Sequence, residues 1–351
     1  MTDAPETEVI DLADIDAGNW DPDQWNDYAI KMGWSDGLPL MLPTEKAVDR
    51  FVAVARGDNE PFGPISPRQV VPTLKSLAAN AVMAGCKPEY FPVVLAGLRA
   101  VLKPEYNLHG TLATTHPCAQ MMLVNGPLRK QLEINCSSNC FGQGWRANGA
   151  IGRALQLILL NVGGAKPADM DRSTQGSPAK YSFCFGENEE ESPWEPYHVR
   201  KGFAASDSVV TTMAAEPPHN INDHSSNSGE GLVVTIVGTA CQAGSNNVYL
   251  QGPSFFVLGP EHAQTLHRDG WTPRSLQEAI YERSKIHVSR ISKENQERWA
   301  QMDRPPVQDH YYMMGSPDDA HIVVAGGPGK HSAFIPSFGN TAAPSVRVAR
   351  T

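Results

Sequence analysis

The apolar run from Ala150 to Val162 constrains the fold more than any other part of the chain. Its large apolar residues recur at the spacing of one helical face, at Ile151, Leu155, Ile158 and Val162. Leucines on the remaining faces predict a helix that is buried nearly all round. Arg153 is the one charged residue in the run, and a charge in such a place needs a partner. We expect that partner among the carboxylates about thirty-five residues further on.

Those carboxylates, Glu187 to Glu191, are the densest acidic group in the sequence. In an extended segment Glu187 and Glu189 point the same way. Carboxylates held this close raise one another's pKa, so that one of them can keep a proton near neutral pH and act as an acid or base. An exposed acidic turn is the alternative. We predict Glu187 and Glu189 as catalytic residues, partly buried at the wall of the main cleft.

Several polar residues around this region are candidates for binding a substrate. A helix that starts after the glycine-rich loop of residues 142–144 presents free N–H groups, which can hold an anion. The substrate-binding candidates lie in this helix, in the segment that carries the glutamates and in a polar loop before them: Thr114, Thr115, Asn148, Arg153, Lys180 and His198.

Two further residues have positions that suit catalysis. His262 lies just beyond the predicted strand 255–258, and the carboxyl end of an interior strand is where α/β proteins place ligands. Cys86 precedes a predicted helix start near Pro88, where the pKa of a thiol is lowered. The alternative for Cys86 is a small buried apolar side chain.

A divalent metal is a candidate cofactor. His219, Asp223 and His224 place two imidazoles and a carboxylate within six residues, in a polar loop. Such groups are metal ligands, although the spacing matches no standard motif.

Composition narrows the class of protein. The net charge is -9, which disfavours nucleic acid and anionic membranes as partners. The first residues are acidic, unlike a leader peptide, and no apolar run is long enough to span a bilayer. Six cysteines in 351 residues do not form a disulfide framework. We therefore expect a cytoplasmic protein.

The order of elements predicts an α/β or α+β fold, a mixed sheet with helices packed around it and a helical N-terminal lead-in. We place a helical region at 1–104 and an α/β main domain that carries the site at 105–351. Helices are predicted at 21–32, 44–55, 72–102 (two), 150–162, 260–267 and 273–286. Strands are predicted at 120–124, 181–185, 209–213, 232–237, 255–258 and 322–325.

The N-terminal region is rich in tryptophan and other apolar residues. Trp20, Trp25, Trp34 and the loop 38–42 carry more apolar surface than a short helical lead-in can bury on itself. They should pack on the main body or on a second copy, and we expect a homo-oligomer.

Several segments resemble those of a bacterial family associated with UGSC-motif (seleno)proteins. The similar segments begin at Gly33 (GWSDGLP), Met83 (MAGCKPEYFPVV), Ala147 (ANGAIGRAL) and Glu187 (ENEEESPW), and the resemblance covers roughly residues 30–340. The UGSC motif itself is absent, since the nearest sequence is Cys241-Gln-Ala-Gly-Ser. The resemblance leaves open that a UGSC-type partner protein with a reactive thiol or selenol works with this chain.

Three functions follow from these patterns. The first is an enzyme of hydrolase, hydratase or lyase type that acts on a small polar or anionic molecule by acid–base chemistry, with or without a metal. The second is a thiol or redox subunit that works with a UGSC-type partner, in which Cys86 or Cys241 would matter most. The third is a non-catalytic assembly subunit whose buried polar network only fixes the fold.

Overall fold

The helices of the N-terminal region form one outer layer of the molecule. The computed structural model describes residues 15, 20–55, 57–58 and 60–349. This layer contains α2 (Pro22–Lys31), α3 (Glu45–Val54), α4 (Leu74–Met83), α5 (Phe91–Val101), α6 (Leu108–Leu112) and, later in the chain, α8 (Arg146–Asn161). Asp21, Thr44 and Thr73 cap the first three of these helices with their side chains, as expected of such residues at helix starts.

The first sheet lies against this helical layer. Its strands are β1 (Ala119–Asn125), β2 (Cys184–Gly186), β3 (Val209–Ala215) and β10 (Ser345–Arg347), in the order β10-β3-β1-β2. Strands β1 and β2 are parallel, whereas β3 is antiparallel to both β1 and β10.

The second sheet contains β4 (His219–Asn222), β5 (Ser254–Leu258), β8 (Ala320–Val324) and β9 (His331–Ile335), in the order β4-β9-β5-β8. Strands β5 and β8 are parallel, and β9 is antiparallel to both β5 and β4. The helices α10 (Gly229–Ala240), α12 (Pro260–Arg268) and α13 (Pro273–Arg283) cover its outer face.

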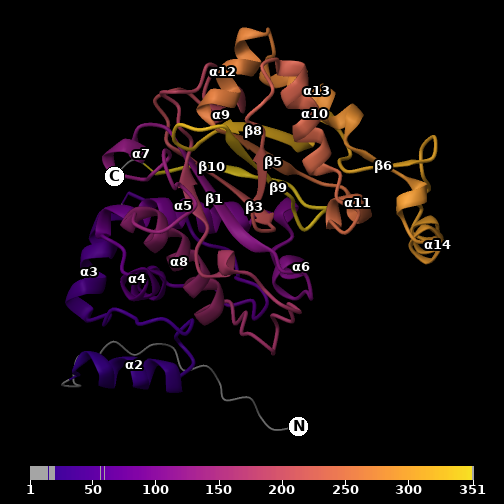
Figure 1. The fold of residues 1–351 in the computed structure, drawn as a ribbon. Helices are drawn as coiled ribbons and strands as arrows, with labels where there is room; N and C mark the ends of the chain where they lie inside the picture. The colour runs from indigo at the N-terminus through magenta and orange to yellow at the C-terminus, as the bar shows by residue number, and fades with distance from the viewer. Residues whose placement is uncertain (1–14, 16–19, 56, 59, 350–351) are drawn as a thin grey trace.

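Three hydrophobic clusters show that the two sheets pack face to face between the helical layers. Met122 and Val124 of β1 belong to the cluster of the N-terminal helices. Their neighbours Met121 and Leu123 pack instead against the second sheet, as the alternation of a strand requires. The order is therefore helices, sheet, sheet, helices. Figure 1 shows the early helices on one side of the strands and α10, α12 and α13 on the other.

The two sheets repeat one topology. The first half runs α5, β1, α8, β2, β3, β4, and the second runs α10, β5, α12 and α13, β8, β9, β10. Each half builds three strands of one sheet and gives its last strand to the edge of the other sheet. The leading helices match as well: α5 contacts β3 and β10, and α10 contacts β9 and β4. The chain is thus a structural repeat with exchanged edge strands.

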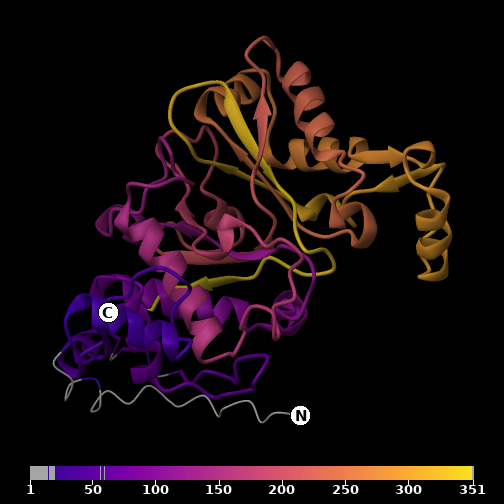
Figure 2. The same ribbon diagram turned by 60° about the horizontal axis from the view of Figure 1, so that its bottom comes forward.

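The remaining elements are short. They are α7 (Leu128–Gln131), α9 (Tyr197–Arg200), α11 (Asn246–Leu250) and an arm made of β6 (Lys285–His287), α14 (Lys293–Gln301) and β7 (His310–Tyr312). The arm stands out from the body in both views (Figures 1 and 2). No helix within the described ranges is both long enough and apolar enough to cross a membrane.

The mixed α/β fold and the helical N-terminal region are confirmed, whereas one predicted strand is wrong. Residues 232–237 lie inside α10 because Leu232, Val233 and Ile236 form a helical stripe against the second sheet. This packing outweighs the preference of β-branched residues for strands.

Residues on both sides of the boundary that we placed at 104 share one hydrophobic core.

The tryptophans of the N-terminal region are largely buried within one chain. Trp25, Trp34 and Leu40 belong to the core of the helical layer, while Leu38 and Met41 are exposed. The apolar surface from which we argued for a second copy is therefore mostly covered by the main body. The homo-oligomer stays a prediction.

Candidate functional site

A group of buried polar side chains lies where the parallel strands of the first sheet end. Asn125 is the last residue of β1, and Glu187 directly follows β2. The register pairs Val124 with Gly186, so that Asn125 and Glu187 are next to one another. Because Leu123 and Phe185 face the second sheet, Asn125 and Glu187 also point into the space between the sheets.

Glu187 is fully buried, and only one of its carboxyl oxygens is hydrogen-bonded. Oε2 accepts from Asn125 Nδ2 at 2.5 Å and from the Tyr197 backbone N–H at 2.7 Å. Oε1 is buried and has no hydrogen-bond partner among the described residues. Burial raises the pKa of Glu187 to about 7, against the lowering effects of Arg200 and the two hydrogen bonds. At neutral pH this carboxyl is therefore near the midpoint of its titration.

Glu189 closes the group on the side toward the solvent. Its Oε1 accepts from the Gly126 N–H at 2.7 Å and from Asn125 Nδ2 at 3.1 Å. Glu187 and Glu189 therefore share the amide of Asn125. A backbone turn brings them there, since the Glu189 N–H donates to the Glu187 carbonyl, and not the extended segment that we predicted. Glu189 is half-buried, but Glu187 is entirely enclosed, which is deeper than we predicted from the sequence.

Arg129 supplies the positive charge of the group. Its guanidinium is buried, and one terminal nitrogen lies 2.7 Å from Glu190 Oε1 and 3.6 Å from Glu189 Oε2. The other terminal nitrogen donates to Cys136 Sγ at 3.2 Å. Burial acts against ionisation of Glu190, but the hydrogen bonds from Arg129 and Lys130 hold its pKa down at about 2. Glu190 is thus a fixed anion that anchors the arginine.

His198 completes the group from α9. Its side chain has no exposed surface, and its ring nitrogens have no hydrogen bond of good geometry within the described part of the chain, although the backbone of Ala204 and Ala205 lies close enough to act on its pKa. Nδ1 lies 3.9 Å from Glu189 Oε1. Burial lowers the pKa of His198 despite the opposing effect of Glu189, so the ring is neutral at pH 7.

The density of unpartnered polar atoms distinguishes this place from the rest of the fold. The group contributes five buried side-chain atoms without a hydrogen-bond partner among the described residues: Asn125 Oδ1, Arg129 Nε, Glu187 Oε1, His198 Nδ1 and His198 Nε2. Buried polar groups in native proteins are nearly always paired. Five such atoms in one contiguous group, which we call the Glu187 cluster, suit a place where a polar molecule binds.

A cavity of about 600 Å³ lies on the far side of the glutamate loop, and none of the residues of the Glu187 cluster lines it. Glu190 and Glu191 form one wall, and Glu261, Gln264 and Lys330 are among the residues of the other. The loop that carries the glutamates therefore separates Glu187 from a hollow that is open to solvent.

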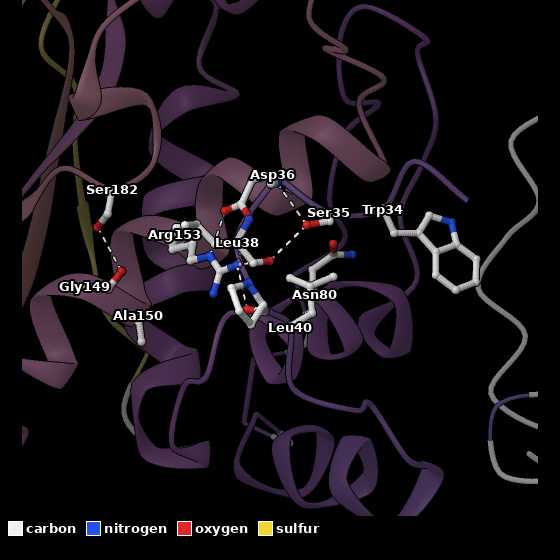
Figure 3. Close-up of polar contacts among 12 residues, drawn as sticks. Trp34, Ser35, Asp36, Leu38, Leu40, Asn80, Gly149, Ala150, Arg153 and Ser182 are labelled. Carbon is white, nitrogen blue, oxygen red and sulfur yellow. Dashed lines mark hydrogen bonds and ion pairs between the residues drawn. The ribbon is translucent and has the colours of Figure 1, made fainter. Parts of the chain in front are cut away.

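Arg153 forms an ion pair, but its partner is not in the glutamate loop. Figure 3 shows its guanidinium facing Asp36, with Nε 2.7 Å and one terminal nitrogen 2.8 Å from the two carboxylate oxygens. The same terminal nitrogen donates to the backbone oxygens of Leu38 and Pro39. Arg153 thus fastens the N-terminal loop to α8, and our prediction that the glutamates would pair with it is wrong.

The other substrate-binding candidates are not gathered around Glu187, except His198. Asn148 is buried and clamps the backbone of Asn135 with both its amide oxygen and its amide nitrogen. Lys180 pairs with Asp171 beside a different cavity. Thr114 and Thr115 lie near that cavity in a loop, where the Thr115 carbonyl accepts from the Thr174 N–H.

Cys86 and His262 are both held in contacts of the fold. The Cys86 thiol donates to the Ala150 carbonyl at 3.3 Å, and burial raises its pKa far above the ordinary value, whereas we expected a lowered one. The ring nitrogens of His262 lie 2.8 Å from Ser332 Oγ and 3.1 Å from the Asp223 carbonyl. A 3-10 turn over Pro88–Tyr90 separates Cys86 from α5, so that Cys86 does not lie at the N-terminus of an α-helix.

The three residues predicted to bind a metal do not form a ligand set. The Asp223 carboxylate accepts hydrogen bonds from Thr235 Oγ1 and from the N–H groups of the two serines that follow it. His224 faces His331 instead, with 3.2 Å between their Nε2 atoms, and His219 is exposed at the start of β4. Within the described residues no group of three or more His, Cys, Asp or Glu side chains could hold a metal ion.

Sequence reasoning missed Asn125, Arg129 and the backbone N–H of Tyr197. Asn125 could have been found, because it follows a predicted buried strand at an Asn-Gly turn, the same position that drew attention to His262. Arg129 could not have been found in this way, because only the folded chain brings it beside residues sixty positions later.

Comparisons with known proteins give no relative for this chain: no family model, no curated protein and no solved structure matches it.

Proposed function

We propose that the chain is an enzyme that transfers a proton on a small polar or anionic substrate, with Glu187 as the acid or base. The observation that supports this proposal is the geometry of Glu187: one carboxyl oxygen accepts two hydrogen bonds, and the other is buried with no hydrogen-bond partner among the described residues. Reactions of hydrolase, hydratase or lyase type need such a group.

The proposed chemistry follows from the two oxygens. Asn125 and the Tyr197 N–H stabilise charge on Oε2 when the carboxyl is ionised, which leaves Oε1 free to take a proton from the substrate. The reverse transfer returns the proton to the product. A pKa near the working pH lets the same carboxyl give and take a proton with little change in free energy.

The neighbouring groups suit a polar or anionic substrate. Arg129 Nε is a buried donor with no acceptor within the described residues, and it can bind a carboxylate or hydroxyl oxygen. The neutral imidazole of His198 can donate with one nitrogen and accept with the other, which suits it to orienting the substrate or a water molecule. The substrate would enter across residues 189–191, from the cavity that Glu190 and Glu191 line.

The state of the thiols supports a reducing compartment such as the cytoplasm. All six cysteines are free within the described residues, including pairs that are close in the sequence. The homo-oligomer and the UGSC-type partner are parts of the proposal that rest on the sequence alone.

A conversion assay tests the proposal. Purified protein is incubated in D₂O with a panel of small carboxylates, hydroxy acids and amides, and turnover and deuterium uptake are followed by NMR. We expect Glu187→Gln to lower the rate by about 10²–10⁴-fold, the usual contribution of an acid–base group. Glu297→Gln, at an exposed position on α14, serves as the matched control and should leave the rate unchanged. Full activity of Glu187→Gln would refute the proposal.

One observation favours the thiol or redox function as a second candidate. Cys136 is half-buried and lies beside Arg129 in the Glu187 cluster, so a thiolate formed there would meet a cation. Burial raises the pKa of Cys136 against this effect of Arg129, which makes the second candidate the weaker one. Loss of turnover in Cys136→Ser together with full turnover in Glu187→Gln would put it ahead.

A further inference from the structure

A second cavity lies at the other end of the first sheet from Glu187. Its volume is about 620 Å³, within the usual range for sites that bind small molecules. The floor is made by Gln120 of β1 and by Gln156 and Leu159 of α8, and residues 165–181 form the cover. Long ordered loops of this kind commonly carry function.

The charged side chains that line this cavity are all paired. Lys180 bonds Asp171, whose other oxygen accepts from the Ser173 N–H. Asp36 engages Arg153 with both of its oxygens. A ligand with a net charge would therefore find no free counter-charge in the lining and would have to break an existing ion pair.

Two carboxamides lie in the floor, and the nitrogen of one of them is unpaired. Gln156 Nε2 is buried and has no hydrogen-bond partner among the described residues. Gln120 is 3% exposed and lines the same cavity. A buried amide without partners costs free energy, so a ligand that satisfies both side chains would recover it.

The remaining wall is largely apolar, with Leu112, Leu159 and Leu160 around the two amides. We propose that this cavity binds a small uncharged molecule with adjacent hydrogen-bond donor and acceptor groups, of the carboxamide or nucleobase type. A glutamine amide offers one acceptor and two donors in a plane, which is the pattern that matches such an edge. The leucines would then cover the flat faces or the apolar part of the ligand.

This site is separate from the Glu187 cluster. Gln120 and Asn125 lie five residues apart on one strand, about 17 Å at the rise of a β-strand. Binding at this cavity can therefore be tested independently of the proton-transfer function.

A matched pair of probes tests the ligand class. Nicotinamide and nicotinate share a ring and differ in whether a carboxamide or a carboxylate is attached, and uracil and adenine extend the test to nucleobases. Saturation-transfer NMR and thermal shift at millimolar concentration measure binding to the full chain. We expect nicotinamide or a nucleobase to bind at least about tenfold more tightly than nicotinate. Equal binding of nicotinate, or no binding of any uncharged probe, would overturn the proposal.

Variants of the two glutamines locate the binding. Gln120→Met and Gln156→Met keep the length of the side chain and remove its hydrogen bonds, so each should weaken binding by at least about tenfold. Gln156→Met should also leave the unliganded protein equally stable or more stable, because an unpaired buried amide nitrogen is gone. Gln301→Met, exposed at the end of α14, is the control and should bind as the unchanged protein does. Unaltered affinity in both floor variants would show that the probe binds elsewhere and would contradict the proposal.

Discussion

Replacing Glu187 by glutamine should stabilise the protein at alkaline pH and have little effect in acid. Below pH 4.5 the carboxyl is protonated in both the folded and the unfolded chain, so it causes no difference. As the pH rises from 4.5 to about 7 the unfolded chain releases a proton that the folded protein keeps. The free energy of unfolding therefore falls over this range and levels off above pH 7.

The size of the effect follows from the two pKa values. A difference between 4.5 and about 7 corresponds to about 3 kcal/mol once both states are ionised. The amide oxygen of glutamine can still accept from Asn125 Nδ2 and the Tyr197 N–H, and it never ionises. We expect Glu187→Gln to be more stable than the unchanged protein by about 3 kcal/mol near pH 8, and within about 1 kcal/mol of it near pH 5.

Urea-induced unfolding at the two pH values measures this difference directly. Glu191→Gln is the matched control, because Glu191 lies on the same loop and is exposed, and it should show no gain that grows with pH. A Glu187→Gln variant that is less stable at alkaline pH, or whose gain does not change with pH, would show that the carboxyl is not held in its neutral form by burial.

Three further predictions concern the frame around the site. Arg153→Met and Asp36→Asn should each lower the free energy of unfolding by about 2–3 kcal/mol. The double variant should lose less than the sum of the two single losses, and urea unfolding in a double-mutant cycle measures this difference. Gly126→Ala should lower the free energy of unfolding by more than about 2 kcal/mol, because Gly126 has φ +85° and the added methyl group would meet a backbone carbonyl. Urea unfolding measures this loss, and an unchanged midpoint would contradict the prediction. Of the six thiols, only Cys136 and Cys241 should react readily with a thiol reagent in the folded state, and rapid reaction of all six would contradict the burial of the others.

The sequence predicts the local elements of this fold far better than their partners. The carboxylates of Glu187 and Glu189 meet at one amide because a tight turn directly follows β2, and a turn is a local property of the chain. The partner of Arg153 could not be predicted in this way, because Asp36 reaches α8 only through the packing of the whole helical layer. The residues of α10 were taken for a strand because β-branched composition does not reveal that a helical stripe faces a sheet.

The repeat was also invisible in the sequence. Its two halves share strand order and direction, while the residues at corresponding places differ. Gly186 and Val324 close the two parallel pairs, and Glu187 in the first half corresponds to Ala325 in the second. Only one half therefore carries a carboxylate at this place, which is why the candidate site is single in a fold with two similar halves.

The measurement that bears most directly on the central claim is the pKa of Glu187 itself. Protein labelled with ¹³C at the glutamate carboxyl carbons is titrated by NMR from acid to mildly alkaline pH, and the Glu187 signal is identified by its absence in Glu187→Gln. We predict a midpoint near 7, shifted upward by burial. A midpoint at the ordinary value of 4.5 would mean that the carboxyl is ionised at neutral pH, and the role of Glu187 as the proton carrier would be contradicted.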